Sequence, residues 1–197
     1  MSAAEATILL LAAGRSSRMQ GRDKLMENID GEPLVRMMAR RALRTGVPVR
    51  VVLGADHAAR RAALEGLDLQ ILEATGQDGM AASIRAGVVG VTGPVLLVLA
   101  DMPEITASDL HLMLSLGAQA PDAILRAASQ DGRPGHPVLF PADLVPELAA
   151  IRGDMGARDI LRAAAARVHL LPLEGERALI DLDTPGDWAD WRAKRGG

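Results

Sequence analysis

Four cationic side chains lie within ten residues near the start of the chain, in the stretch LAAGRSSRMQGRDKL at residues 11–25. They are Arg15, Arg18, Arg22 and Lys24. Gly14 has no side chain to block a ligand, so the N–H groups of this loop can turn toward an anion. Arg18 can donate two hydrogen bonds to one phosphate, and Lys24 adds a mobile point charge. Because a triphosphate carries several negative charges close together, these convergent donors favour a triphosphate site.

Two other interpretations of this loop stay open from the residues alone. The loop could be a basic turn that faces solvent, or it could be a dinucleotide-binding loop. The spacing in GRSSRMQG lacks the G-x-G-x-x-G pattern of dinucleotide sites, and no G-K-[ST] follows it as in a P-loop. The hydroxyl groups of Ser16 and Ser17 add donors for a phosphate.

Two carboxylates follow apolar segments farther along the chain. Asp101 comes directly after the run VLLVLA, and Asp183 lies in the stretch LIDLDTPGDW with Asp181 two residues before it. In an extended chain Asp181 and Asp183 share one side. Mg²⁺ prefers oxygen ligands and usually takes one or two carboxylates together with substrate phosphates. The alternative is that these aspartates only begin a turn or a helix.

The composition excludes several classes of function. The net charge of the 197-residue chain is −3, which gives no general attraction to nucleic acid or to an anionic membrane. One Phe, two Trp and no Tyr argue against a surface that stacks on bases. Because the chain has no cysteine, disulfides, thiolate metal sites and cysteine nucleophiles are excluded. No apolar run reaches the roughly 18 residues of a membrane span, so we expect a soluble, cytoplasmic protein.

Short apolar runs alternate with longer amphipathic segments in the first half of the chain. The runs are apolar throughout, which is typical of strands buried on both faces of a parallel sheet. This alternation predicts right-handed crossovers, a doubly wound sheet and ligands beyond the carboxyl ends of the strands. The predicted strands are 6–13, 49–54, 69–74 and 93–100, and the predicted helices are 34–46, 56–67, 80–91 and 106–120.

Residues at the ends of these helices have the types expected there. Pro33 suits a first helical turn, and Asp56 is the predicted N-cap of the second helix, with Gly66 as its end. Thr106 and Asp109 are spaced as in a capping box.

The second half of the chain is less regular. Its predicted strands are 122–129, 135–140 and 168–173, of which the first two form an antiparallel pair, and its predicted helices are 156–167 and 184–195. Thr184 is the expected cap of the last helix. No linker or repeat divides the chain, so the sequence predicts a single α/β domain at 1–197.

The motifs together resemble one enzyme family. The stretch LAAGRSSRMQGRDKL resembles the L-A-[AG]-G-x-S-x-R-M-G…K loop of the nucleotidyltransferases related to molybdenum cofactor guanylyl- and cytidylyltransferases, with Gln20 where Gly is usual. DMP at 101–103 resembles the family's metal-binding step, and DLDTPGD at 181–187 resembles its C-terminal D-x-D-T-P-x-D element. GMAASIRAG, GHPVLF and GDMGAR resemble further family elements, so the resemblance runs in order from Leu9 to about Trp188.

The resemblance implies a Rossmann-like fold of the nucleotide-diphospho-sugar transferase type, with a nucleotide-binding half at about 1–105 and an acceptor-binding half at about 106–197. It implies catalytic roles for Arg18, Lys24 and Asp101. It implies that Asp101 and Asp183 hold Mg²⁺, with Mn²⁺ as the alternative metal. The acceptor is expected against His136, Asp154 and Arg158. The implied nucleotide contacts are Leu11, Ala12, Ala13, Gly14, Arg15, Ser16, Lys24, Gly79 and Ser83.

Some of these positions have an ordinary structural role as the alternative. Gly79 could simply cap a helix, and the Ser83 hydroxyl could bond back within its own helix. His136 could be an ordinary histidine at a strand edge.

The resulting hypothesis is transfer of CMP from CTP to the terminal phosphate of molybdopterin, with release of pyrophosphate. The Ala-Ala-Gly form of the first loop is more similar to the cytidylyl branch of the family. A phosphate has a second pKa near 6, so the attacking oxygen is already ionised near pH 7 and no general base is required. The expected partners are CTP and the molybdenum cofactor, together with a client molybdoenzyme. We expect a monomer that binds neither nucleic acid nor membrane.

Other functions remain open from the sequence. A sister enzyme would use GTP or another phosphorylated small-molecule acceptor. A cofactor-carrying chaperone of a molybdoenzyme would bind the nucleotide without turnover, but carriage alone does not need two carboxylates for a metal-centred transfer. A redox dehydrogenase is least supported, because the dinucleotide fingerprint is lacking.

Overall fold

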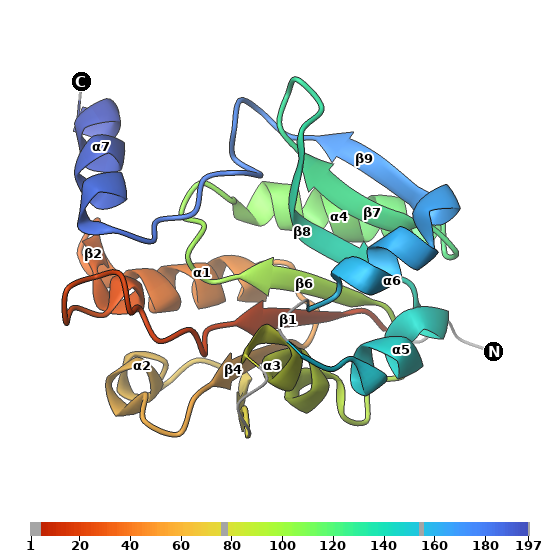
Figure 1. Cartoon of the computed structure of the whole chain (residues 1–197), viewed down its shortest axis with the longest axis horizontal. Helices are drawn as coiled ribbons and strands as arrows, with labels where there is room; N and C mark the ends of the chain where they lie inside the picture. The colour runs from red at the N-terminus through yellow and green to blue at the C-terminus, as the bar shows by residue number, and fades with distance from the viewer. Residues whose placement is uncertain (1–4, 76–78, 154–155, 197) are drawn as a thin grey trace.

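The computed structural model describes residues 5–75, 79–153 and 156–196 and shows a seven-stranded sheet with helices packed on both of its faces (Figure 1). The strand order across the sheet is β5-β4-β1-β6-β8-β7-β9. The bounds of these strands are β1 Thr7–Leu11, β4 Val49–Leu53, β5 Gln70–Glu73, β6 Val95–Leu99, β7 Ile124–Ala128, β8 Pro134–Phe140 and β9 Val168–Pro172.

Strand direction agrees with the prediction. β1 pairs in parallel with β4 and with β6, and β4 pairs in parallel with β5. β8 is antiparallel to both β6 and β7, while β9 is parallel to β7. The predicted doubly wound, mostly parallel sheet with an antiparallel element in the second half is therefore confirmed. Because β8 runs in the opposite direction, its first residues lie at the edge where β1 and β6 end.

Two apolar cores lie on opposite faces of the sheet, because successive side chains of a strand alternate between its faces. Leu10 of β1 belongs to the core under α1 and α4, and Leu9 belongs to the core under α3, α5 and α6. This burial on both faces explains why the strands are apolar throughout. The bounds of the helices are α1 Leu34–Leu43, α3 Gly79–Val88, α4 Ala107–Gln119, α5 Val145–Ala150 and α6 Arg158–Ala163.

The helices begin within two residues of the predicted starts, but α1, α3 and α6 end three or four residues before the predicted ends. Helix α2 (Ala58–Ala63) ends three residues before the predicted Gly66. Thr106 and Asp109 form the predicted capping box of α4. Asp56 as the N-cap of α2 is wrong, because His57 occupies that position and its ring Nδ1 accepts a hydrogen bond from the N–H of Gly54. Pro33 is the N-cap of α1 and so lies one position before the first helical turn.

The sequence did not predict the first hairpin, helix α5, or the short 3₁₀ helices η1 (Lys24–Met26) and η2 (Ala142–Leu144). The hairpin of β2 (Asn28–Ile29) and β3 (Glu32–Pro33) turns at an Asp-Gly pair with positive φ at both residues, a sequence signal that would have found it. Helix α5 has a proline in its first turn, where proline is tolerated, although the residue resembles a helix breaker in the sequence. No helix within the described ranges is long and apolar enough to cross a membrane.

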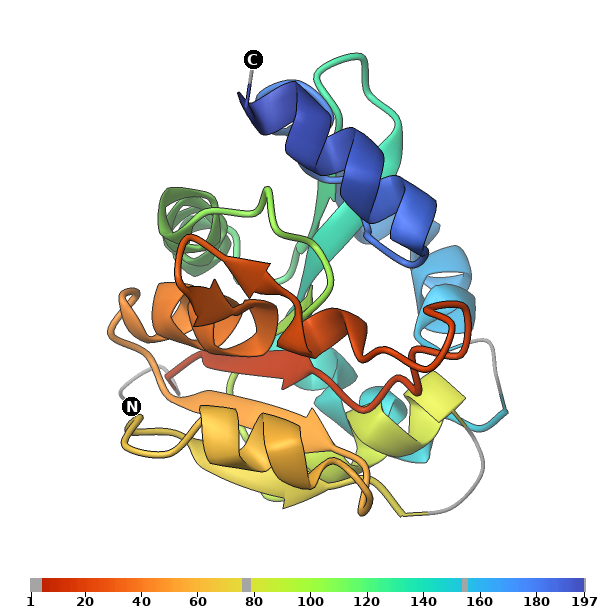
Figure 2. The ribbon, with the colours of Figure 1, turned by 90° about the vertical axis from the view of Figure 1, so that its left-hand side faces the viewer.

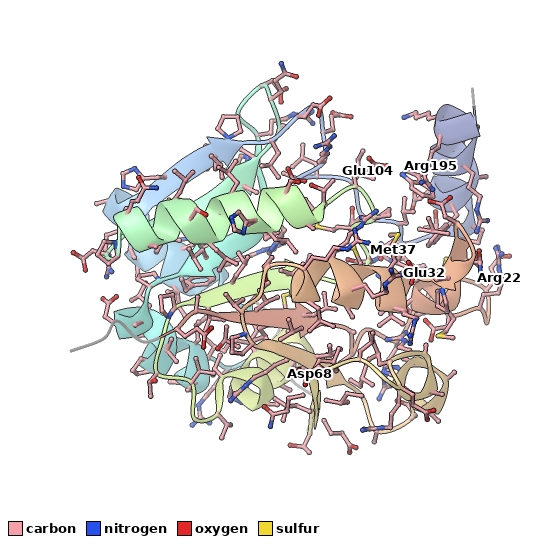
Figure 3. The ribbon with its side chains drawn as sticks, turned by 180° about the vertical axis from the view of Figure 1, so that it is seen from behind. Arg22, Glu32, Met37, Asp68, Glu104 and Arg195 are labelled. Carbon is pink, nitrogen blue, oxygen red and sulfur yellow. The ribbon has the colours of Figure 1, made fainter. Side chains whose placement is uncertain are left out.

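Helix α7 (Pro185–Gly196) stands at the carboxyl-end side of the sheet, next to the first loop (Figure 2). Trp191 Nε1 donates to Glu104 at 2.5 Å, and Arg195 pairs with Asp30 of the β2–β3 turn at 2.5 Å. Figure 3 shows Glu104 and Arg195 on the side where α7 stands over α1. Thr184 accepts from the N–H of Asp187, which confirms it as the cap. These contacts fix the segment that leads into α7.

Gly135 of β8 provides a test of this packing. A Cβ at this position would overlap the carbonyl oxygen of Ala178, which accepts a hydrogen bond from the N–H of His136. Because backbone must move to relieve the overlap, we expect Gly135→Ala to lower the free energy of unfolding by about 1–3 kcal/mol or more in chemical denaturation. Gly186→Ala is the matched control, since its Cβ would meet only an ordinary contact with Thr184. Equal stability of the two variants would contradict this packing.

Candidate active site at the carboxyl ends of β1 and β6

A lysine and two aspartates from three distant segments meet at the carboxyl edge of the sheet. Lys24 Nζ lies 2.5 Å from Asp101 Oδ2 and 2.5 Å from Asp183 Oδ1. Lys24 begins the short 3₁₀ helix η1 (Lys24–Met26), Asp101 follows the end of β6, and Asp183 precedes α7. The N–H of Leu182 donates to the carbonyl of Asp101 at 3.1 Å, which holds the last two segments together. The sequence predicted all three residues as functional, and the structure brings them together.

Lys24 is the electrostatic centre of this cluster. Its side chain is only 11% exposed. Burial lowers the pKa of Lys24, but the charges and hydrogen bonds of Asp101 and Asp183 outweigh burial and raise the pKa above its ordinary value. Lys24 is therefore a fixed positive charge at neutral pH. Arg18 Nη2 also reaches Asp183 Oδ2 at 2.5 Å, but the Arg18 side chain is 68% exposed, so solvent weakens this pair.

The carboxylates fit a divalent cation. Asp101 Oδ1 is buried and has no hydrogen-bond partner among the described residues, so this oxygen is available to a further ligand. Partial burial raises the pKa of Asp181, and the negative charges of Asp183 and Asp101 raise it further. Within the described residues, no group of three or more His, Cys, Asp or Glu side chains is arranged around one metal position. Two carboxylates completed by substrate oxygens are nevertheless a donor set that suits Mg²⁺ or Mn²⁺.

The first loop is folded back on itself before it reaches Lys24. The Ser16 hydroxyl accepts from the N–H of Lys24 at 3.2 Å and donates to Asp23 Oδ1 at 3.3 Å. Asp23 caps η1 by accepting from the N–H of Leu25 at 2.9 Å. The hydroxyl of Ser16, which was expected to donate to a phosphate, is thus used inside the loop. Contact of Ser16 with the nucleotide stays a prediction. Gly14, Arg15 and Arg18 lie exposed on the outer side of the loop.

Three predicted nucleotide contacts precede Gly14. Leu11 and Ala12 are buried in the cores, and the N–H and C=O of Ala12 are both hydrogen-bonded inside the fold. Ala13 is half-buried at the start of the loop. The structure therefore gives Leu11 and Ala12 a supporting role under the loop, while contact of these three residues with nucleotide stays a prediction.

The two predicted residues of α3 differ from one another. Gly79 begins the helix with φ +53, a conformation that suits glycine. Ser83 is 4% exposed, and its hydroxyl donates to the carbonyl of Gly79 at 3.4 Å. The structure thus contains the hydrogen bond within the helix that the sequence left open as the alternative role of Ser83. Its side chain is already used within the helix, so nucleotide contact by Ser83 stays a prediction.

A cavity of about 340 Å³ lies beside the lysine cluster, between β6, β8 and α6. Its polar lining comprises Arg126, His136, Arg158 and Asp181. The predicted acceptor residues His136 and Arg158 thus share one cavity, whereas Asp154 lies outside the described residues. Among its apolar lining residues are Ile84, Leu97, Leu99, Val138, Phe140 and Leu161.

Arg126 was not predicted from the sequence, but it joins the predicted acceptor residues in this cavity. Its Nε donates to the carbonyl of Gly135 at 3.0 Å. Burial lowers the pKa of the Arg126 guanidinium, and the positive charge of Arg158 acts in the same direction. Two guanidinium groups close enough to repel each other favour an anion between them. The signal in the sequence was one arginine inside the apolar strand AILRAA.

His136 is a neutral group in the same cavity. Its Nδ1 is buried without a partner in the described part of the chain. Burial lowers the pKa of His136 to about 4, and the positive charge of Arg126 also lowers it. The imidazole is therefore uncharged at neutral pH and can offer a hydrogen bond without adding charge.

This lowered pKa predicts a pH dependence of stability. In the unfolded chain a histidine protonates near pH 6.5, whereas native His136 stays neutral down to about pH 4. Between these values the unfolded state binds more protons, so the free energy of unfolding falls as the pH falls from about 6.5 to about 4. We expect the His136→Gln variant not to show this fall in the free energy of unfolding. The two proteins should differ by about 1.4 kcal/mol for each unit between the native and the unfolded pKa of His136. Urea unfolding at several pH values measures the effect, and parallel curves for the two proteins would contradict it.

Comparisons with known proteins identify the family of the chain. A model of the MobA-like NTP transferase domain matches residues 8–168. The chain belongs to the MobA-like NTP transferase family. A molybdenum cofactor guanylyltransferase of Pseudomonas paraeruginosa is 31% identical over 186 residues, which cover 91% of this chain and 90% of that protein. The bifunctional protein GlmU of Anaeromyxobacter dehalogenans is 34% identical over 59% of this chain, but the match spans only 26% of GlmU.

Solved structures of family relatives share the fold of this NTP transferase. Rv0371c from Mycobacterium tuberculosis superimposes with a TM-score of 0.82 at 28% identity, and both chains are covered completely. A structure of Rv0371c in complex with manganese superimposes with a TM-score of 0.77 at 26% identity, again with complete coverage of both chains. The family and the fold make the chain a nucleotidyltransferase, and NTP transferases typically depend on a divalent metal.

Proposed function

We propose that this NTP transferase transfers CMP from CTP to the terminal phosphate of molybdopterin and releases pyrophosphate. The observation that carries the proposal is the cluster of Lys24, Asp101 and Asp183, because its charges suit a reaction in which two anions must be brought together. The 340 Å³ cavity beside it supports a separate acceptor molecule on the other side of the cluster.

In the proposed reaction an oxygen of the acceptor phosphate forms the new bond to the α-phosphorus of CTP. The bond from the α-phosphorus to the bridging oxygen breaks, and pyrophosphate leaves with that electron pair. The acceptor oxygen is ionised near pH 7, so no side chain has to remove a proton. The neutral state of His136 agrees with a role in binding rather than in proton transfer.

The chain's own residues have two tasks in this scheme. Asp101 and Asp183 would hold the divalent cation, which when bound would neutralise charge on the α-phosphate and on pyrophosphate. As the second task, Lys24 keeps its contacts with both carboxylates and directs its remaining N–H toward the phosphates, where it stabilises the negative charge that develops on the leaving group. Arg18 and the N–H groups around Gly14 lie on the exposed side of the loop and add donors for the outer phosphates.

The acceptor side of the proposal rests on the charge of the cavity. Arg126 and Arg158 supply positive charge for a phosphate, and the apolar wall suits a flat ring system. GTP is the second candidate for the nucleotide, because the relative from Pseudomonas paraeruginosa is a guanylyltransferase. The Ala-Ala-Gly form of the first loop favours CTP by resemblance to the cytidylyl branch.

The experiment that tests the proposal measures pyrophosphate release. The purified protein is incubated with molybdenum-loaded molybdopterin, Mg²⁺ or Mn²⁺, and each NTP separately. Release with CTP alone supports the proposal, and release with GTP alone replaces it with the sister activity. A protein that binds nucleotide but releases no pyrophosphate with any NTP would contradict the transfer to molybdopterin.

Two of the three charged residues of the cluster provide a sharper test. We expect Asp101→Asn and Lys24→Ala each to lower turnover at least about 100-fold, since one lost electrostatic contact raises the barrier by roughly 3–4 kcal/mol. Circular dichroism checks that the fold is retained. Asp143→Asn is the matched control, because Asp143 is an exposed carboxylate that pairs with Arg167 at 2.8 Å on the surface. Near-normal turnover in either cluster variant would exclude the assigned role.

Arg126 separates acceptor binding from nucleotide binding. Arg126→Gln removes one positive charge from the cavity, so we expect KM for the phosphorylated acceptor to rise about tenfold, or roughly 1.4 kcal/mol, with an unchanged Kd for the nucleotide. Arg133→Gln is the control, because Arg133 lies exposed on the adjoining turn and pairs with Asp131 and Glu176. The same change in KM for both variants would show that Arg126 acts only through general charge.

A further inference from the structure

Arg60 of α2 lies buried beneath the first loop, although nothing in the sequence singles it out. The residue is 1% exposed. Its Nε and Nη2 donate to the two oxygens of Asp23, at 2.7 Å each, so the pair is bidentate. Its Nη1 donates to the carbonyl of Ala12 at 2.5 Å, and its Nη2 also lies 3.1 Å from the Ser16 hydroxyl. One guanidinium therefore joins the beginning, the middle and the end of the loop.

The ion pair adds no net charge beneath the loop. Burial raises the pKa of Asp23, but the hydrogen bonds and charge of Arg60 outweigh it and lower the pKa below its ordinary value. Asp23 is thus ionised, and its negative charge cancels the positive charge of the Arg60 guanidinium. A neutral pair does not attract a triphosphate from a distance. Its contribution to an anion site is therefore to hold the first loop in one conformation. A buried guanidinium is retained only with such complete pairing, because unpaired burial is strongly unfavourable.

The position of Arg60 is itself fixed by the start of α2. His57 Nδ1 accepts from the N–H of Gly54, just beyond the end of β4, and lies 3.4 Å from Arg60 Nη1. Burial lowers the pKa of His57, and the positive charge of Arg60 lowers it further, so this imidazole is neutral beside the guanidinium. Figure 1 shows α2 below the loop that leads into η1. The sheet therefore holds α2, and α2 holds the guanidinium against the loop.

The groups that Arg60 holds are the ones that hold Lys24. Ser16 accepts from the N–H of Lys24, and Asp23 is the residue before Lys24 and caps the 3₁₀ helix that Lys24 begins. Contacts thus run without a break from Arg60, through Ser16 and Asp23, to the backbone of Lys24. The Lys24 ammonium at the other end lies between Asp101 and Asp183.

We propose that Arg60 is a positioning residue of the triphosphate site, which closes the first loop through Asp23 and Ser16 and so sets the place of Lys24. Arg60 does not touch the substrate. This role rests on the proposed nucleotidyl transfer for its effect on turnover, but its effect on binding of a triphosphate does not require turnover. A lysine at position 60 would keep the charge but lose the fork that joins Asp23 to the loop backbone.

The test uses Arg60→Lys, Lys24→Ala and the double variant in the full-length protein. Calorimetry measures the Kd for inorganic triphosphate with Mg²⁺, and pyrophosphate release gives kcat and KM. Arg36→Lys is the matched control, because Arg36 also ties the end of α2 through backbone carbonyls, at 2.6 Å to Ala63 and 3.0 Å to Glu65, away from the loop. Thermal unfolding of each variant shows whether stability changes by a similar amount.

We expect Arg60→Lys to weaken triphosphate binding and to lower kcat/KM at least about tenfold, and to have less than about a threefold effect when Lys24 is already alanine. Arg36→Lys should leave both constants unchanged. Additive effects of Arg60→Lys and Lys24→Ala, or equal losses in the Arg36 control, would overturn the proposal and leave Arg60 as a purely structural residue.

Two further results separate this proposal from the proposed function. A wild-type protein that binds triphosphate but releases no pyrophosphate would refute the nucleotidyl transfer to molybdopterin. In that case the Kd for triphosphate would still decide the role of Arg60. A wild-type protein that does not bind triphosphate would overturn the positioning role. If Arg60→Lys fails to fold, Ser16→Ala removes the hydroxyl that links Arg60 to Lys24, and unchanged triphosphate affinity in that variant counts against the proposal.

Discussion

A buried lysine between two carboxylates is the interaction on which the rest of the site depends. The side chains of Lys24, Asp101 and Asp183 are 11%, 18% and 19% exposed. An ammonium removed from water is stable only beside opposite charge, and two carboxylates held close together repel each other unless a cation lies between them. Each charge therefore offsets the cost of burying the others. The three segments that carry these charges are held together at one point.

The direction of β8 explains why the cavity that contains Arg126 and His136 adjoins this cluster. In a fully parallel sheet the strand next to β6 would begin at the opposite edge. Because β8 is antiparallel to β6, with Leu97 opposite Val138, its first residues lie beside the carboxyl end of β6. His136 is thereby brought near Asp101, whose charge acts on it. Arg126 enters the cavity from β7, the next strand. One reversed strand thus places cavity and cluster side by side.

The cations of the first loop differ in how firmly they are held. Arg15 and Arg18 are exposed, so their side chains can adapt to phosphates that arrive from solvent. Lys24 is fixed by carboxylates on one side and by the hydrogen-bonded interior of the loop on the other. Beneath the loop, Arg60 and Asp23 form a neutral pair. This arrangement combines mobile charge at the surface with one charge whose position is defined, which suits a reaction that must orient an α-phosphate.

The sequence by itself determined the alternation of strands and helices, the basic loop and the two aspartates, because these follow from residue type and short spacing. It also indicated Arg158 and His136, through family resemblance. Only the tertiary structure decided that Lys24 joins Asp101 to Asp183 and that Arg60 and Arg126 belong near the site. The physical reason is that such pairings join segments far apart in the chain, and a buried charge is recognised only when its partner is seen.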